Sequence, residues 1–126
     1  MAEDVFVQPL QPVVAAPLEL RGRRFDNARP AVMAILNRTT DSFYATTGTS
    51  GLAEALALLD LVVAEGADIV DVGGVRAGQV GAWVDADEEV SRVLPFLRAA
   101  RAAHPDLVLS LDTWRSEVVL ACAEAG

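Results

Sequence analysis

Residues 67–74 read ADIVDVGG, a run of strand length that ends in two adjacent glycines. The nearly continuous apolar residues indicate a β-strand that is buried on both faces, as in parallel sheets. The glycines indicate a tight turn or a close approach of the backbone, and they match neither a GxGxxG fingerprint nor a phosphate-binding loop. The stretch therefore predicts a central parallel strand, and the segments on either side of it decide the class of fold.

A helix is predicted between this strand and an earlier one. The segment 52–65 places a set of apolar residues on one helical face, namely Leu52, Ala55, Leu56, Leu59 and Val63. Ser50 is expected to cap the start of this helix and Gly66 its end. The apolar run AVMAIL at 31–36 predicts the earlier strand.

The same pattern continues on the carboxyl side. The segment 85–103 predicts a second helix, with Asp85 as its N-cap and an acid three residues later, the spacing of a capping box. The segment 106–112, DLVLSLD, predicts a third strand, and a third helix is expected from Ser116. This alternation indicates an α/β fold in which helices cover a parallel sheet that is buried on both faces.

The amino-terminal part differs in composition. Residues 1–17 contain three prolines and no sustained periodicity, so we expect a flexible arm ahead of a domain at 18–126. Residues 18–26, LELRGRRFD, predict a short hairpin with Gly22 at its turn. The chain has 126 residues, of which 52% are hydrophobic and 22% charged, and this predicts a single globular domain.

Charge and cysteine content exclude several classes of partner. The formal net charge of -8 disfavours non-specific binding to nucleic acid or to an anionic membrane surface. No apolar stretch follows the acidic start that could serve as a signal peptide or membrane span, so we expect a cytoplasmic protein. The single cysteine, Cys122, allows no disulfide within the chain and is interpreted as a small core residue.

Polar residues follow each predicted strand of the parallel sheet. Asn37, Asp71 and Asp112 each stand where an apolar run ends. Because ligands bind at the carboxyl ends of parallel strands, we expect these three side chains to lie in register at one edge, as a binding site. Taken singly, each could instead be structural and accept hydrogen bonds from loop amides.

The histidine and the two tryptophans have simpler interpretations. His104 precedes a proline at the predicted end of a helix, which favours a C-terminal cap over a ligand. Trp83 and Trp114 lie in loops near the proposed site. Either could form the wall of an aromatic ligand site or pack on a helix, and the sequence leaves both alternatives open.

Four segments of the chain resemble the dihydropteroate synthase family in order and spacing. They are ILNRTTDSF (35–43), ADIVDVGG (67–74), EEVSRVLPFL (88–97) and LSLDTWRSEV (109–118). The resemblance extends over 18–126 and implies a (β/α)8 TIM barrel. The chain would supply the N-terminal hairpin, closing the amino face, and the first three βα units. Since a full barrel needs about 250 residues, we expect two unpaired sheet edges and no stable enzyme from this piece alone.

The resemblance also implies an activity. Members of the family are transferases of folate biosynthesis that join p-aminobenzoate to (7,8-dihydropterin-6-yl)methyl diphosphate, releasing diphosphate and forming dihydropteroate. By position in the motifs, Asn37 would bind the diphosphate with its Mg²⁺ cofactor, and Asp112 would bind the pterin and act in catalysis. Asp71 would be a second catalytic carboxylate at the pterin. Arg76 is a substrate-binding candidate, although it is out of register with the family's loop arginine. The full-length protein is expected to be a homodimer.

The loops depart from the family pattern, which leaves alternatives open. The segments 38–49 and 75–83 differ from the family where its p-aminobenzoate site is formed. A pterin-binding paralogue without synthase activity is therefore one alternative, and a pterin-binding methyltransferase domain is another. The first loop, close to LN-T-PDSF, favours the synthase over the methyltransferase. The missing glycine fingerprint weighs against a Rossmann-type nucleotide enzyme.

Overall fold

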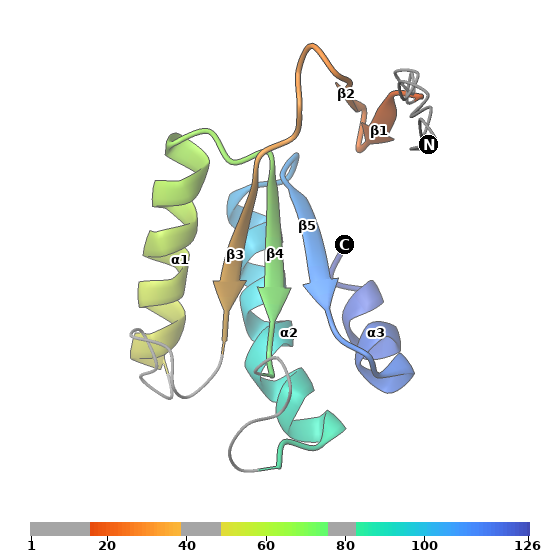
Figure 1. Ribbon diagram of the computed structural model, residues 1–126. Coiled ribbons are helices and arrows are strands. Elements are labelled where there is room, and N and C mark those ends of the chain that lie inside the picture. Colours follow the sequence, from red (N-terminus) through yellow and green to blue (C-terminus); the bar gives the residue numbers. More distant parts are fainter. Residues whose placement is uncertain (1–15, 39–48, 76–82) are drawn as a thin grey trace, which may run out of the picture.

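A computed structural model describes residues 16–38, 49–75 and 83–126. Its elements are β1 (Leu18–Leu20), β2 (Arg23–Phe25), β3 (Met33–Asn37), α1 (Thr49–Ala64), β4 (Ile69–Gly73), α2 (Ala86–Ala103), β5 (Val108–Asp112) and α3 (Ser116–Ala123). The hairpin, three strands and three helices expected from the sequence are all present (Figure 1). The arm expected at 1–17 lies outside the described residues except for its last two.

Strands β3, β4 and β5 form a parallel sheet in the order of the sequence. The register aligns Ile35 with Asp71, and Asn37 with Gly73. All three strands run in the same direction, so their carboxyl ends meet at one edge of the sheet (Figure 1). The predicted parallel α/β fold is confirmed.

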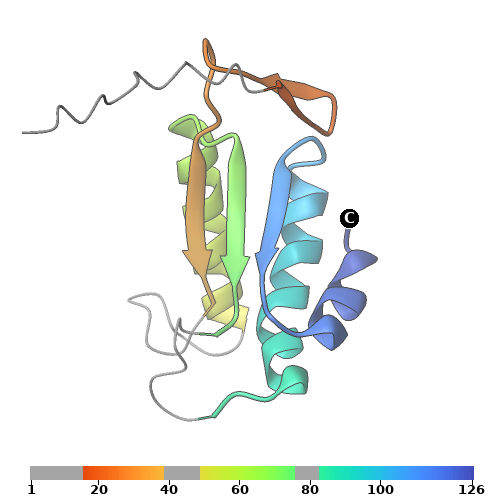
Figure 2. The same cartoon turned by 45° about the vertical axis from the view of Figure 1, so that its right-hand side comes forward.

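The core lies on one face of the sheet. Val70 and Val72 of β4 are fully buried, and they belong to the same cluster as Leu59 of α1 and Phe96 of α2. Figures 1 and 2 show α1 and α2 on the same side of the strands. Successive parallel crossovers of the same hand place their helices on the same side, which explains this arrangement.

The opposite face corrects an expectation from the sequence. We expected strands buried on both faces, but Met33 and Ile35 are more than half exposed, at 53% and 67%. Their neighbours Ala34 and Leu36 pack against the core. Alternate residues of the continuous apolar run therefore differ in burial, since one set packs against the core and the other is exposed. None of the described helices covers the face that carries Ile35.

The helix caps are only partly as expected. Asp85 is the N-cap of α2, and its side chain accepts a hydrogen bond of 2.9 Å from the backbone N–H of Glu88. Gly66 follows α1 with a φ of +104°, a conformation that favours glycine at a helix end. The expectation for Ser50 was wrong, because α1 begins at Thr49 and contains Ser50. Of the helices in the described ranges, none is long and apolar enough to cross a membrane.

The hairpin is fastened at the amino end of the sheet through Asp68. Residues Arg21 and Gly22 form its two-residue turn with φ of +47° and +74°. Arg23 of β2 forms an ion pair with the buried Asp68 carboxylate, and Arg29 approaches the same oxygen at 3.2 Å. The other oxygen of Asp68 accepts a hydrogen bond of 3.0 Å from the Val32 N–H. The hairpin therefore lies at the end of the sheet that the family resemblance implies.

Replacing Asp68 with asparagine is expected to destabilise the full-length protein by about 2 kcal/mol. Asparagine is neutral and offers one acceptor oxygen, so either the Val32 N–H or the arginines lose their partner. Urea unfolding should show a lower midpoint with an unchanged slope. The control is Asp26→Asn in the same hairpin, whose ion pair with Arg24 is 3.8 Å long and exposed. Equal midpoints for the two variants would contradict the role given to Asp68.

Candidate functional site

Asn37, Gly73 and Asp112 form one row across the carboxyl edge of the sheet. The register aligns Asn37 with Gly73, and Gly73 with Asp112. A Cβ atom added to Gly73 would lie 2.8 Å from Asn37 Oδ1 and 3.9 Å from Asp112 Oδ2. The amide and the carboxylate therefore flank the bare backbone of Gly73 on the same face of the sheet.

Asp71 lies one row deeper than expected. The sequence placed it in register with Asn37 and Asp112, but β4 continues to Gly73, and Asp71 is aligned with Ile35 and Ser110. The hydroxyl of Ser110 donates a hydrogen bond to Asp71 Oδ1. Asp71 is half-buried on the same face as Gly73, because side chains two residues apart on a strand point the same way.

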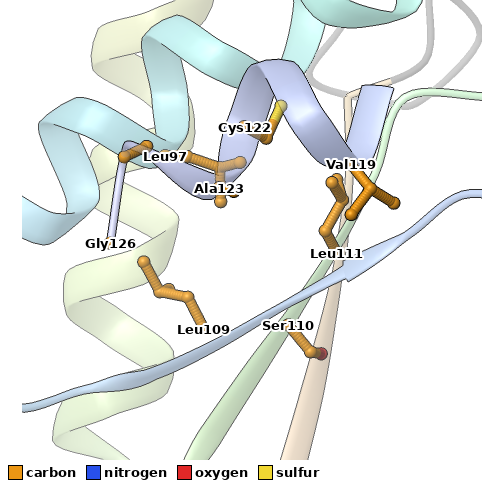
Figure 3. A pocket seen from close by; sticks show the side chains of 9 residues that line it. Leu97, Leu109, Ser110, Leu111, Val119, Cys122, Ala123 and Gly126 are labelled. Atoms are coloured by element: carbon orange, nitrogen blue, oxygen red, sulfur yellow. The ribbon is translucent and has the colours of Figure 1, made fainter. Parts of the chain in front are cut away.

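These side chains occupy the face of the sheet that the described helices leave uncovered. Figure 3 shows this for β5, where Leu109 and Leu111 point toward α3 and Ser110 points away from it. Asn37 and Asp112 are both exposed. The face thus presents two carboxylates, one amide and one hydroxyl. The carboxylates can accept hydrogen bonds from a ligand, and the amide and the hydroxyl can accept or donate them.

Gly74 joins this edge to α2. A Cβ at Gly74 would lie 2.9 Å from Val93 Cγ1, 3.0 Å from Glu89 Cγ and 3.3 Å from the Glu89 carbonyl oxygen. The carbonyl oxygen of Gly74 accepts a hydrogen bond of 3.0 Å from the Arg92 guanidinium. Of the two alternatives for the adjacent glycines, a tight turn or a close approach, the close approach is present at both, toward Asn37 at Gly73 and toward α2 at Gly74.

An ion pair that the sequence did not reveal lies behind the row. The Glu89 carboxylate is fully buried and paired with the guanidinium of Arg115, whose side chain is only 11% exposed. Arg115 also donates a hydrogen bond of 2.6 Å to the Val84 carbonyl oxygen. Glu89 is the last of three adjacent acids at the start of α2, and its spacing of four residues from Val93 places it on the buried face of the helix.

The two tryptophans lie against this arginine. The guanidinium carbon of Arg115 is 4.7 Å from the ring centroid of Trp114 and 5.6 Å from that of Trp83. Both rings remain mostly exposed, at 60% and 75%. Neither is buried in the core, and whether either contacts a ligand stays a prediction.

Arg38 is a second residue that sequence analysis missed. Its backbone N–H donates a hydrogen bond of 2.6 Å to the Gly73 carbonyl oxygen, and its guanidinium donates one of 2.8 Å to the Gly51 carbonyl oxygen. The guanidinium carbon lies 5.9 Å from the ring centroid of Phe96. Burial lowers the pKa of Arg38 from its ordinary value. Arg38 therefore ties the end of β3 to β4 and to α1.

His104 and Cys122 have the structural roles that the sequence indicates, a helix cap and a core residue. His104 is the C-cap of α2, and its backbone N–H bonds the Ala100 carbonyl oxygen, as expected. Its Nε2 also lies 2.7 Å from Asp60 Oδ1 of α1. Cys122 is buried in the core, and burial, followed by the charge of Glu89, raises the pKa of its thiol above the ordinary value.

A cavity of about 240 Å³ lies away from the row, beside α3 and β5 (Figure 3). Its lining is mostly apolar and includes Leu97, Leu109, Leu111, Val119, Cys122 and Ala123. It lacks the convergent polar groups that orient a ligand. We therefore place the candidate site at the row and not at this cavity. Arg76, the remaining candidate from the sequence, lies outside the described residues.

The metal expected from the family resemblance has one candidate ligand here. No cluster of three or more His, Cys, Asp or Glu side chains suited to a metal ion occurs within 16–38, 49–75 and 83–126. Mg²⁺ often binds through one protein oxygen together with waters and substrate phosphates, and so needs no such cluster. The exposed amide oxygen of Asn37 at the strand end fits that requirement.

Comparison with known proteins gives a consistent picture. The model of the family described as "Pterin binding enzyme" matches residues 33–126. The chain is 47% identical over 107 residues to "Inactive dihydropteroate synthase 2" of Mycobacterium bovis, covering 85% of this chain and 33% of that protein. It is 35% identical over 105 residues to dihydropteroate synthase of Streptococcus pyogenes, covering 83% of this chain and 39% of that protein.

A solved structure resembles the chain in three dimensions. Dihydropteroate synthase of Xanthomonas albilineans, determined with 4-aminobenzoic acid, superposes with a TM-score of 0.73 at 35% sequence identity. The match covers 87% of this chain and 40% of that one. The chain thus spans only about a third of the length of the curated relatives it matches.

Proposed function

The chain belongs to the family of pterin-binding enzymes, and on this premise we propose that its strand-end row binds a dihydropterin methyl diphosphate. The observation that carries the proposal is the alignment of Asn37, Gly73 and Asp112, with Asp71 one row deeper on the same face. A flat, hydrogen-bonding ring needs such a set of acceptors beside a bare stretch of backbone. Rigid strands hold these groups, which favours a fixed ligand geometry.

The roles of the residues follow from their chemistry. The Asp112 carboxylate accepts hydrogen bonds from pterin ring N–H groups and stabilises positive charge that develops on the pterin. Asp71, held by the Ser110 hydroxyl, contributes a second carboxylate deeper on the same face. The bare backbone of Gly73 leaves room for the ring between the flanking side chains. The Asn37 amide lies at the rim of the row, where the diphosphate is expected.

The proposed reaction transfers the (7,8-dihydropterin-6-yl)methyl group from diphosphate to an aromatic amine. The amine nitrogen of p-aminobenzoate attacks the methylene carbon, and the carbon–oxygen bond to diphosphate breaks with the electron pair leaving on diphosphate. The amine then loses a proton, which gives dihydropteroate. The row contributes by holding the pterin and by stabilising the charge that builds up as diphosphate departs.

Magnesium is the proposed cofactor. When bound, it neutralises charge on the departing diphosphate. The neutral amide oxygen of Asn37 would hold the ion without adding negative charge beside the leaving group.

The architecture and assembly of the complete protein are also proposals. The similarity to the Xanthomonas albilineans enzyme supports an eight-stranded βα barrel in which the described sheet supplies three neighbouring strands. In such a barrel the exposed face of Met33 and Ile35 would be the interior. We also propose a homodimer for the complete protein, since the family resemblance implies one.

A second candidate is a pterin-binding protein without synthase activity. The chain is 47% identical to a relative named as inactive and 35% identical to one named as a synthase. The departures from the family pattern fall in the loops, whereas Asn37, Asp71 and Asp112 match it. This combination favours a retained pterin site with an altered second-substrate site.

Diphosphate release distinguishes the two candidates. The full-length protein is given dihydropterin methyl diphosphate and magnesium, with and without p-aminobenzoate. Release that requires p-aminobenzoate and is lost in Asn37→Ala and Asp112→Ala supports the synthase. Tight pterin binding without release supports the second candidate. Absence of pterin binding by the wild-type protein would refute both.

A further inference from the structure

The buried pair Glu89–Arg115 connects the ends of two strands that carry the row. On one side, the backbone and Cγ of Glu89 are packed against Gly74, directly after β4. On the other side, Arg115 follows β5 by three residues, and its backbone N–H donates a hydrogen bond of 3.2 Å to Thr113 Oγ1. The Glu89–Arg115 ion pair thus links the segment that follows Gly73 to the segment that follows Asp112.

The geometry of Arg115 is restrained from several directions. Its guanidinium edge donates to Glu89 and to the Val84 carbonyl oxygen, while its carbon lies within 5.6 Å of both tryptophan ring centroids. A planar, forked donor that is held by two acceptors and lies close to two rings has few alternative orientations. The loop that begins after Asp112 is therefore fixed to α2.

Stability alone is a weak explanation for this pair. Removing two charges from water is costly, and an apolar pair of similar volume is often as stable. The second oxygen of Glu89, Oε1, is buried without a hydrogen-bond partner among the described residues. A costly and only partly satisfied ion pair fits a role in fixing the geometry of the neighbouring site.

We propose that Glu89 and Arg115 are positioning residues that set the distance between the Gly73 backbone and the Asp112 carboxylate. The proposal rests on the function proposed for the row. Neither residue touches the ligand. Glu89 holds the end of β4 through Gly74, Arg115 holds the loop after Asp112, and their ion pair keeps the two ends in one relative position.

The test compares matched changes at the two ends of the sheet in the full-length protein. Arg115→Lys keeps the charge but loses the planar fork, and Glu89→Gln keeps the shape but loses the charge. Asp68→Asn is the control, since it also neutralises a buried ion-paired carboxylate, at the amino end of the sheet. Each variant is measured by urea unfolding, by titration with 7,8-dihydropterin, and by hydrogen exchange of residues 72–75 and 112–115.

The proposal predicts a separation of affinity from stability. Arg115→Lys and Glu89→Gln should weaken dihydropterin binding about tenfold, as is typical when a residue that orients a binding group is changed. Asp68→Asn should lower the unfolding midpoint and leave binding within twofold. Arg115→Lys should also accelerate exchange at residues 72–75, although the substitution lies beyond β5. Should Glu89→Gln fail to fold, Arg115→Lys carries the test.

Two results would overturn the proposal. One is binding by Arg115→Lys within twofold of the wild-type protein, and the other is an equal loss of binding in Asp68→Asn. If the wild-type protein binds no dihydropterin, the proposed function fails, and exchange alone decides the present inference. Unchanged exchange at residues 72–75 in Arg115→Lys would then show that the pair does not couple the two strands.

Discussion

Replacing Asp112 with alanine is expected to weaken dihydropterin binding by about two orders of magnitude, roughly 3 kcal/mol. The carboxylate is the proposed acceptor for pterin N–H groups, and hydrogen bonds to a charged acceptor are the strong ones. Asp112 is exposed and forms no ion pair within the described residues, so the unfolding free energy should change by less than about 0.5 kcal/mol. Titration by pterin fluorescence and urea unfolding measure the two quantities.

The control for this change is Asp106→Ala, which removes the same charge from an exposed position before β5, at the other end of the strand. Affinity should then stay within twofold of the wild-type value, because long-range charge effects are screened at physiological salt. Similar losses in both variants would show that net charge, and not the contact at Asp112, governs binding. An unaltered affinity in Asp112→Ala would remove the residue from the site.

The positions of Asn37 and Asp112 could be predicted because they depend on local sequence. Each follows an apolar run, and parallel strands bring their carboxyl ends to one edge whatever the loops do. The sequence predicts Asp71 one row too high, because the change from apolar to polar residues at Asp71 does not mark the end of the strand. Glycine carries no such signal, and the ladder continues through Gly73.

Contacts between distant segments could not be predicted in the same way. Glu89 and Arg115 stand 26 residues apart, and their pairing depends on how α2 packs against the loop after β5. The Arg38 guanidinium bonds the carbonyl oxygen of Gly51, which stands 13 residues further along the chain. An arginine in either place is also compatible with an exposed surface, so the sequence gives no reason to bury it.

The exposed face of the sheet shows a further limit of sequence reasoning. An apolar run predicts that both faces are covered, but it does not identify the covering segments. The helices cover the face of Val70 and Val72. The face of Met33 and Ile35 would need strands or side chains beyond those described, as a closed barrel would provide.

The adjacent glycines give the second prediction with a large effect, because alanine should destabilise the protein at Gly74 but impair the binding site at Gly73. Gly74→Ala is expected to destabilise the full-length protein by about 3 kcal/mol. Its Cβ would approach Val93 at 2.9 Å and the backbone oxygen of Glu89 at 3.3 Å, and a helix backbone cannot move away locally. Urea unfolding should show the lower midpoint.

Gly73→Ala is expected to spare stability and impair the site. Its Cβ would lie too close only to the end of the Asn37 side chain, at 2.8 Å, because the nearest Asp112 atoms are at an ordinary contact distance of 3.9 Å. An exposed amide can rotate away at a cost of about 1 kcal/mol or less. That rotation removes the Asn37 oxygen from the row, and the new methyl group occupies the bare backbone between Asn37 and Asp112. Dihydropterin affinity should therefore fall about tenfold or more while the unfolding midpoint stays near the wild-type value. If Gly73→Ala bound dihydropterin normally, the ligand would lie elsewhere, since no pterin could occupy the row without contacting this methyl group.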